Sequence, residues 1–425
     1  MWYKPLIEVF KIKDLRSKVL FIFFIFFIFS ILANIPIPDI DFEKLKQTFE
    51  QFKLLGVLNI FTGGTLERFS IAMLGLGPYV ISVVILQLLT MIFPALEKMY
   101  KEGGEEGRKK FEQYGRILTP FLSALQAFGM ITLFSHQGII SNTSFLATFS
   151  SIFVISAGTV LLMWLGELIS EKRIGEGISL LILAGIAADL PRNTLVIVGN
   201  FEMSKIFSYL TFFIIALLII FFVALVVEAK RIITVSYSKR VRGFKMYGGT
   251  TTYLPISVNP AGVMPIIFAL SILTLPSMVA NFFITSSGTL GQIAKDIVLF
   301  FENPFVYGFL YFILVVAFTY FYTAIVFDPK KISENLQKMG GFIPGIRPGQ
   351  TTTNYLSSVL NKTLVFGSIF LGLIAIMPIV VQSITRVQAF DFLVGGTSVL
   401  ILVSVILQTF ERIKAEVEMR EYEKV

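Results

Sequence analysis

The chain has 425 residues, of which 55% are hydrophobic and only 15% charged, and its mean hydropathy is +0.78. Soluble globular domains carry about a quarter charged residues, so this composition excludes a soluble protein and predicts an all-α polytopic membrane protein. The absence of cysteine excludes disulfides and thiolate chemistry. The formal net charge of +8 bears first on membrane topology, with no need for nucleic acid.

Ten apolar segments have the length of about 20 residues that a membrane-spanning helix needs. Their approximate limits are Val19–Ile37, Ser70–Phe93, Ile117–Ser135, Phe145–Leu165, Ile178–Gly199, Ile206–Val227, Gly262–Ile284, Phe305–Phe327, Thr363–Ile384 and Phe392–Phe410. No small-residue cleavage site follows the first apolar run, so we expect no secretory signal peptide. An even number of spans places both termini on one side.

Lysine and arginine predict which side this is. The termini and the loops on their side contain 28 of the 36 Lys and Arg residues, and the opposite loops contain the other 8. Because basic loops remain in the cytoplasm, we expect both termini to be cytoplasmic.

Two of the expected cytoplasmic loops are longer than a turn requires. One spans 228–258 and contains YSKRVRGFKMYGG, and the other spans 328–362 and contains KMGGFIPGIRPGQTTTNY. A solvated basic loop would account for the lysines alone. The second loop, however, is expected to expose apolar residues on a backbone stiffened by proline, which is typical of a docking tip. Protruding arginines indicate a large cytosolic partner with an acidic or phosphate-bearing surface.

The stretch 61–87, FTGGTLERFSIAMLGLGPYVISVVILQ, begins as a polar, Gly-rich turn and continues apolar through Gly75, Gly77 and Pro78. The seventh segment is similarly interrupted, by Pro265 and Pro276. Irregular backbone at membrane depth is tolerated where it is buried in protein or lines a cavity. We therefore expect two kinked helices that wall a water-accessible path, with a movable element at its mouth.

Ionisable residues are missing from the depth of the ten segments; Glu167, Asp189 and Arg192 lie near segment ends. A secondary transporter for a small solute, the alternative function, needs such groups. A membrane enzyme needs a polar cluster, and the lone His136 cannot form a metal site. The sequence also lacks a GxxxxGK[ST] loop. We therefore expect no catalytic residue, no metal, no cofactor and no direct nucleotide binding.

Six motifs carry a family resemblance. They are LGLGPYVISVVILQLL (74–89), MWLGELISEKRIGEGISLLILAG (163–185), VNPAGVMPIIFA (258–269), YFYTAIVFDP (320–329), GGFIPGIRPGQTT (340–352) and LVGGTSVLILV (393–403). In order and with compatible spacing, from the first span to the tenth, the chain resembles the SecY family, the channel subunits of the bacterial protein-conducting translocon.

This resemblance implies two five-helix halves, 1–205 and 206–425, with inverted pseudo-symmetry around an hourglass pore. It implies a lateral gate between the second and third spans on one side and the seventh and eighth on the other. The implied function is translocation of unfolded preproteins across the cytoplasmic membrane and lateral insertion of apolar segments into it. The implied partners are SecE-like and SecG-like subunits, the motor ATPase SecA, the ribosome, signal sequences and membrane lipid.

The resemblance also implies site residues, matched motif by motif. The pore ring falls on Leu76, Val80, Ile178, Ile182, Ile267 and Ile401. The plug, a short helix at about 58–69, includes Asn59, Phe61, Gly63, Gly64, Leu66 and Arg68. The lateral gate includes Pro78, Gln87, Pro265 and Pro276, and the docking tips carry Lys239, Arg240, Arg242, Lys245 and Arg347. The chain departs from the family pattern at Leu76 and Val80, where isoleucine is usual, and at Phe244, where a basic residue is often found.

Overall fold

The computed structural model describes residues 10–38, 40, 41, 43–45, 62, 64–140, 144–199, 203, 206–237, 240–242, 245–247, 251–283, 288–385 and 396–423. Each of the ten apolar segments coincides with a helix. These helices are α2 (Lys13–Ala33), α5 (Gly77–Ile92), α7 (Gly104–His136), α8 (Phe145–Glu171), α9 (Gly177–Gly199), α10 (Ile206–Glu228), α11 (Met264–Phe283), α13 (Pro304–Val326), α15 (Gln350–Thr385) and α16 (Gly396–Glu423).

Length and composition make the chain a multi-pass membrane protein. Within the described residues, six helices are long and apolar enough to cross a bilayer. A seventh span results if α5 and α6 (Pro94–Lys101), bent by 112° at the break between them, count as one. The apolar parts of α9 and α11 are shorter. The number of ten spans therefore remains a prediction.

Two of the prolines that were expected to kink helices stand at helix starts. Residues 71–76 form turns, and α5 begins only at Gly77, with Pro78 in its first turn. Pro265 likewise lies in the first turn of α11. A proline at this position loses no helical hydrogen bond and has a suitable φ, so both residues start helices and the expectation that they kink them is wrong. Pro276 does lie inside α11.

The two long loops contain strands and a helix, which were not predicted from the sequence. The first forms β1 (Lys230–Tyr237) and β4 (Thr251–Ser257), paired antiparallel, with β2 (Arg240–Arg242) and β3 (Lys245–Tyr247) pairing beyond them. The second contains α14 (Pro329–Lys338) and β5 (Gly341–Phe342), which pairs with β1. Alternate strand residues point to one side, and a small core forms there from Ile233, Val235, Ile256, Leu336, Ile343, Leu356, Leu360 and Leu364.

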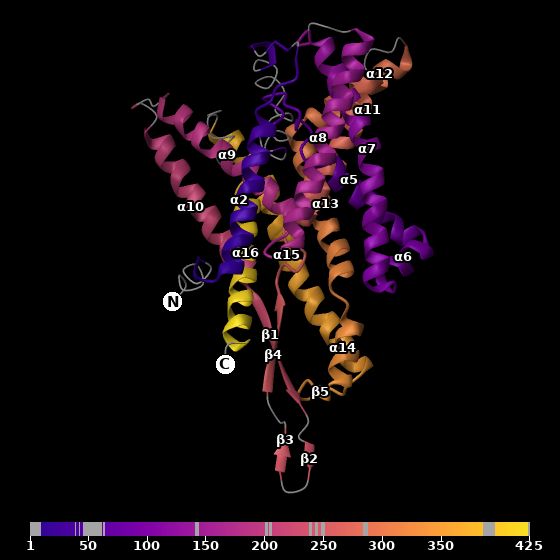
Figure 1. The fold of residues 1–425 in the computed structure, drawn as a ribbon, viewed down its shortest axis with the longest axis vertical. Coiled ribbons are helices and arrows are strands. Elements are labelled where there is room, and N and C mark those ends of the chain that lie inside the picture. The colour runs from indigo at the N-terminus through magenta and orange to yellow at the C-terminus, as the bar shows by residue number, and fades with distance from the viewer. Residues whose placement is uncertain are drawn as a thin grey trace.

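The molecule is an elongated helical bundle with these strands at one end (Figure 1). The helix α14 also lies at the strand end, toward which α2 begins and α16 ends, whereas α12 (Thr289–Glu302) lies at the opposite end. The outward face of α10 carries large exposed side chains, such as Phe207 at 79% and Phe213 at 60% exposure. Such faces are typical of helices in contact with lipid tails.

The first and last of these helices are joined by charges. At the start of α2, Lys18 Nζ lies 2.9 Å from Glu416 Oε1 of α16, and Arg420 of α16 donates a hydrogen bond to Asp14. Beneath the charges, Leu15 and Val417 pack together, at 0% and 3% exposure. We call this set of residues the end contact.

Candidate functional site: a polar cavity leading to an apolar cluster

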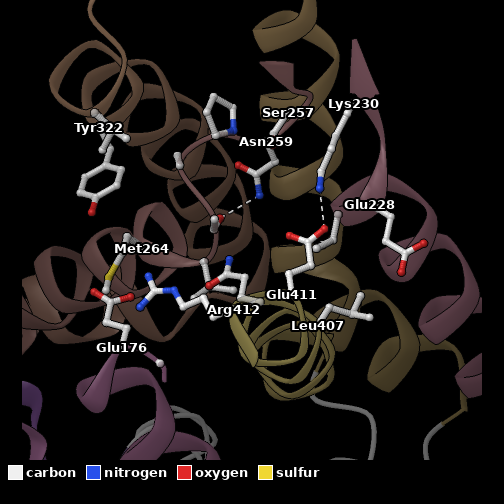
Figure 2. A pocket seen from close by; sticks show the side chains of 18 of the residues that line it. Glu176, Glu228, Lys230, Ser257, Asn259, Met264, Tyr322, Leu407, Glu411 and Arg412 are labelled. Atoms are coloured by element: carbon white, nitrogen blue, oxygen red, sulfur yellow. Dashed lines mark hydrogen bonds and ion pairs between the residues drawn. The ribbon is translucent and has the colours of Figure 1, made fainter. Parts of the chain in front are cut away.

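A cavity of about 450 Å³ opens among elements from distant parts of the sequence (Figure 2). The turn between α8 and α9 supplies one wall, β1 with the end of β4 supplies another, and α11, α13 and α16 complete it. Its polar lining is formed by Ser170, Glu176, Glu228, Lys230, Ser257, Asn259, Tyr322, Gln408, Glu411 and Arg412. The cavity therefore joins the strand end of the molecule to the interior of the helical bundle.

Charges of both signs face this cavity. Lys230 Nζ of β1 donates to Glu411 Oε1 of α16 at 2.5 Å. The partly buried Glu176 precedes α9 and accepts a hydrogen bond from the Ser179 hydroxyl at 3.2 Å. Burial raises the pKa of the Glu176 carboxyl above its ordinary value, and Ser179 and the positive charge of Arg412 oppose this only in part. Figure 2 shows the Arg412 guanidinium beside that carboxylate.

Close backbone packing sets the position of the turn that carries Glu176. A Cβ atom at Gly177 would lie 1.7 Å from the carbonyl oxygen of Gly166 on α8, so only glycine allows the start of α9 to approach α8 this closely. The Ser170 hydroxyl accepts a hydrogen bond from the Gly177 amide at 2.9 Å. These contacts explain why glycine stands at position 177, one residue before Ile178.

The six residues matched to the ring belong to, or pack against, the main apolar cluster of the helical bundle, together with many other residues. Five of them are buried: Leu76 (4% exposed), Val80 (5%), Ile182 (5%), Ile267 (3%) and Ile401 (0%). Ile178 is partly buried and packs against the same cluster. The cluster borders the cavity, because Val263 and Met264 belong to both, and Ile267 follows Met264 by about one helical turn on α11.

The described part of the plug segment forms consecutive turns and not the expected helix. Leu66 and Phe69 are each 1% exposed and pack in a second apolar cluster, where the rings of Phe69 and Phe134 on α7 make an edge contact. These two side chains therefore belong to a cluster other than that of the ring residues. Three of the matched plug residues, Asn59, Phe61 and Gly63, lie outside the described residues.

A polar latch ties this segment to α9 and to the end of α2. The Arg68 guanidinium donates to Asp189 Oδ1 at 2.8 Å and to Asn34 Oδ1 at 2.7 Å. Gly64 has a φ of +73°, and a Cβ there would lie 1.8 Å from Asp189 Oδ2. Glycine at position 64 thus leaves room for the carboxylate that Arg68 holds.

The wall matched to the lateral gate is formed by α5 and α7 packed on α11. We call these packed surfaces the front contact. Gln87 of α5 is 7% exposed, and its Oε1 atom has no hydrogen-bond partner in the described protein. The Ser277 hydroxyl of α11 is buried and unpartnered in the same way. Pro78 and Pro265 are also buried, whereas Pro276 is exposed.

The docking tips differ in how much the structure describes. Arg240 and Arg242 lie on β2 and Lys245 on β3, while Lys239 falls outside the described residues. Arg347 is exposed, and its carbonyl oxygen accepts a hydrogen bond from the Thr352 hydroxyl at 2.9 Å. The expectation that this loop exposes its apolar residues is wrong for Ile343. At 5% exposure, Ile343 packs in the small core under the strands.

The described residues contain no group of three or more His, Asp or Glu side chains that could hold a metal ion. A polar cavity bordered by a large apolar cluster, inside a bundle of apolar helices, suits a membrane channel. The fold and the site define the class as a membrane channel.

Comparisons with known proteins identify the kind of channel. The SecY family model matches residues 70–410. The protein translocase subunit SecY of Thermotoga maritima is 40% identical, over 98% of this chain and 96% of its own. That of Corynebacterium glutamicum is 37% identical, over 98% of both chains. A solved protein-conducting channel, 19% identical, superposes with a TM-score of 0.66 over 94% of this chain and 92% of its own. Sec61 from a canine ribosome-channel complex, 18% identical, superposes with a TM-score of 0.59 over the same shares.

The chain belongs to the SecY family. It is a protein-translocation channel and not an enzyme.

Proposed function

We propose that the chain conducts unfolded preproteins across the cytoplasmic membrane through a ring formed by the six clustered aliphatic side chains. The observation that carries this proposal is that residues 76, 80, 178, 182, 267 and 401 all belong to, or pack against, the main apolar cluster, which borders the polar cavity through Val263 and Met264. An apolar constriction excludes ions by dewetting. Branched aliphatic side chains can also yield to a passing chain and repack behind it.

The segment at about 58–69 acts as the plug of this channel. The Arg68–Asp189 pair and the close fit of Gly64 hold it when no chain is passing. Because the pair is partly exposed, at 22% and 20% of its side chains, it contributes little stability and can exchange its partners for water. This fits a stopper that must leave and return.

The front contact acts as the lateral gate, with Gln87, Pro78, Pro265 and Pro276 in its walls. An arriving signal sequence competes for the apolar surfaces of α5 and α11, and each Å² that it removes from water supplies about 25 cal/mol. A ligand that binds the parted form better than the closed form shifts the equilibrium toward opening. Apolar segments of the passing chain then reach the lipid through the same opening.

The strand end faces the cytoplasm, with both termini on that side, and the halves meet near residues 205 and 206. Support comes from the basic residues, which are concentrated in the termini and in the loops that carry the strands. The tips with Lys239, Arg240, Arg242 and Lys245, and with Arg347, dock SecA or the ribosome, while SecE-like and SecG-like subunits complete the channel. A solved ribosome-channel complex of the similar Sec61 supports a ribosomal partner.

Reconstitution with a SecE-like subunit, SecA, ATP and a preprotein tests this function. We expect the preprotein to become protected from protease inside vesicles. No protection, with every partner shown to be functional, contradicts the proposal.

The same assay tests docking with a matched pair of charge reversals. Arg347→Glu is expected to abolish motor-driven transport, because the exposed guanidinium no longer attracts the partner. Lys338→Glu reverses an exposed charge on α14 in the same loop and is expected to leave transport intact. Equal activity of the two variants removes the assignment of Arg347 to docking.

A further inference from the structure

The helix α12 stands apart from the channel described so far. It links α11 to α13 at the end opposite the strands (Figure 1). Its 14 residues span about 21 Å, too short to cross a bilayer. From the sequence, this stretch was expected to be part of a connecting loop.

One face of α12 is packed on the protein. Gly291 and Ala294 are buried, and Phe301 packs against the main apolar cluster. These positions are spaced as one stripe along a helix, so they define the inward side.

A second apolar stripe runs beside the first and is not covered. Leu290, Ile293 and Phe300 are 63%, 55% and 53% exposed, with the partly buried Ile297 between them. The exposed Gln292, Lys295 and Asp296 lie on the remaining side of the helix, where Leu299 is the one exposed apolar residue. A helix on a soluble surface carries polar residues outward, so this stripe needs an apolar environment.

The chain itself indicates which environment this is. Two residues after α12 ends, the spanning helix α13 begins at Pro304. Its own exposed stripe starts at once, with Phe305 at 88%, Phe309 at 65% and Ile313 at 44% exposure. The Asn303 side chain caps this helix by accepting a hydrogen bond from the Phe305 amide at 3.1 Å. The exposed apolar surface of α12 is therefore continuous along the chain with a surface that faces lipid.

We propose that α12 is an interfacial helix that binds membrane lipid. Its stripe of Leu290, Ile293, Ile297 and Phe300 lies in the boundary between head groups and acyl chains, the usual position of such helices, and Lys295 and Asp296 face water. Because α12 packs along α11, lipid binding holds the outer end of α11, a wall of the front contact. This last role rests on the proposed function, whereas the lipid contact does not.

Tryptophan fluorescence in vesicles tests the lipid contact on the full chain. The chain has two tryptophans, Trp2 and Trp164, and replacing both with phenylalanine gives a dark background. Single tryptophans are then placed by Ile293→Trp in the exposed stripe and by Lys295→Trp on the polar side. The vesicles contain phosphatidylcholine with brominated acyl chains, and unbrominated vesicles give the reference emission.

We expect Ile293→Trp to emit at a shorter wavelength than Lys295→Trp. Bromine should quench it as strongly as it quenches Trp164, which is 53% exposed on the spanning helix α8 and is measured alone in the Trp2→Phe protein. Lys295→Trp should emit as a tryptophan in water and stay unquenched. Equal, unquenched emission of both variants overturns the proposal. A blue-shifted but unquenched Ile293→Trp also overturns it, because protein and not lipid then covers the stripe. The readout needs no transport, so it stays interpretable if the channel function fails.

Discussion

Two of the places where the proposed halves, 1–205 and 206–425, meet have opposite chemistry. At the front contact, α5 and α7 pack on α11 with apolar side chains and with unpartnered polar atoms on Gln87 and Ser277. At the end contact, α2 and α16 are joined by charges. Among the described residues, the ion pairs that cross between the halves are confined to α2 and α16.

This difference shows which contact an apolar ligand can open. Parting the front contact exposes apolar surface that a signal sequence or lipid then covers. This covering offsets the free-energy cost of parting the contact. Parting the end contact separates charges, and an apolar ligand offers nothing in return. We therefore expect the halves to part at the front contact while the end contact holds them together.

A charge buried at the front should have the largest effect. Val84 of α5 is 1% exposed in the main apolar cluster. A carboxylate from Val84→Asp would be buried without a partner, which costs about 3 to 5 kcal/mol. We expect a strong rise in ion leak through proteoliposomes and a loss of thermal stability. Val84→Thr keeps the shape without the charge and is the control; a folded aspartate variant that leaks no more than this control contradicts the account.

The latch of Arg68 and Asp189 lies within residues 1–205, so a substitution there should loosen the plug segment and leave the front contact and the end contact unchanged. Gly64→Ala places a Cβ against Asp189, so we expect this carboxylate to turn away from Arg68 and the plug segment to loosen. Gly138→Ala is the matched control, because Gly138 has a φ of +69° and no neighbour within 4 Å of the added atom.

Both substitutions share a strain of about 1–2 kcal/mol from the left-handed backbone. An ion leak that rises only in Gly64→Ala supports the role of the latch in holding the plug segment. Equal leaks in the two variants contradict that role.

The end contact should give a smaller effect, on stability alone. The side chains of Lys18 and Glu416 are each 21% exposed, and pairs of this kind contribute about 0.2–1 kcal/mol. A double-mutant cycle of Lys18→Met and Glu416→Gln, followed by unfolding in detergent, should show a coupling of this size that shrinks in high salt. Transport should survive in all variants. If transport is lost although the variants stay folded, the end contact is part of the moving surface.

The smallest effect is expected at Glu176, whose carboxylate lies beside the Arg412 guanidinium in the cavity. A carboxyl whose pKa is raised on folding stabilises the protein below its unfolded pKa, and this contribution is lost as the pH rises through the folded pKa. Glu176→Gln should therefore unfold at a higher temperature than the parent at neutral pH. Below the ordinary glutamate pKa the two proteins should unfold at the same temperature. A difference that stays constant with pH would trace to packing instead.

The length and apolar composition of the segments predicted the helices well, because burial in lipid and in the bundle acts on whole segments. The starts of α5 and α11 were misjudged, since a proline breaks a helix or begins one depending on residues before it. The strands β1 and β4 were missed because Ile233, Val235 and Ile256 form a core only with α14 and α15, which are distant in sequence.

The candidate site was likewise predictable from the sequence only in part. The i, i+4 spacing predicted that Leu76 with Val80 and Ile178 with Ile182 share a helix face. Ile178 and Ile182 lie on α9, whereas Leu76 is the residue before α5, and all four belong to or pack against the main apolar cluster. The latch could not be predicted, because Arg68 and Asp189 are 121 residues apart. Nor could the cavity, whose walls come from five separate parts of the chain.

Cross-linking from a stalled preprotein tests the central claim, that a passing chain moves through the apolar cluster. The chain has no cysteine of its own, so Ile401→Cys and, on the lipid-facing side of α10, Phe213→Cys each give a single thiol. A preprotein arrested in transit and carrying a thiol-reactive group should link to position 401, although Ile401 is 0% exposed at rest, and should not link to position 213. Links to position 213 alone, or to neither while the preprotein is protease-protected in transit, contradict a path through this cluster.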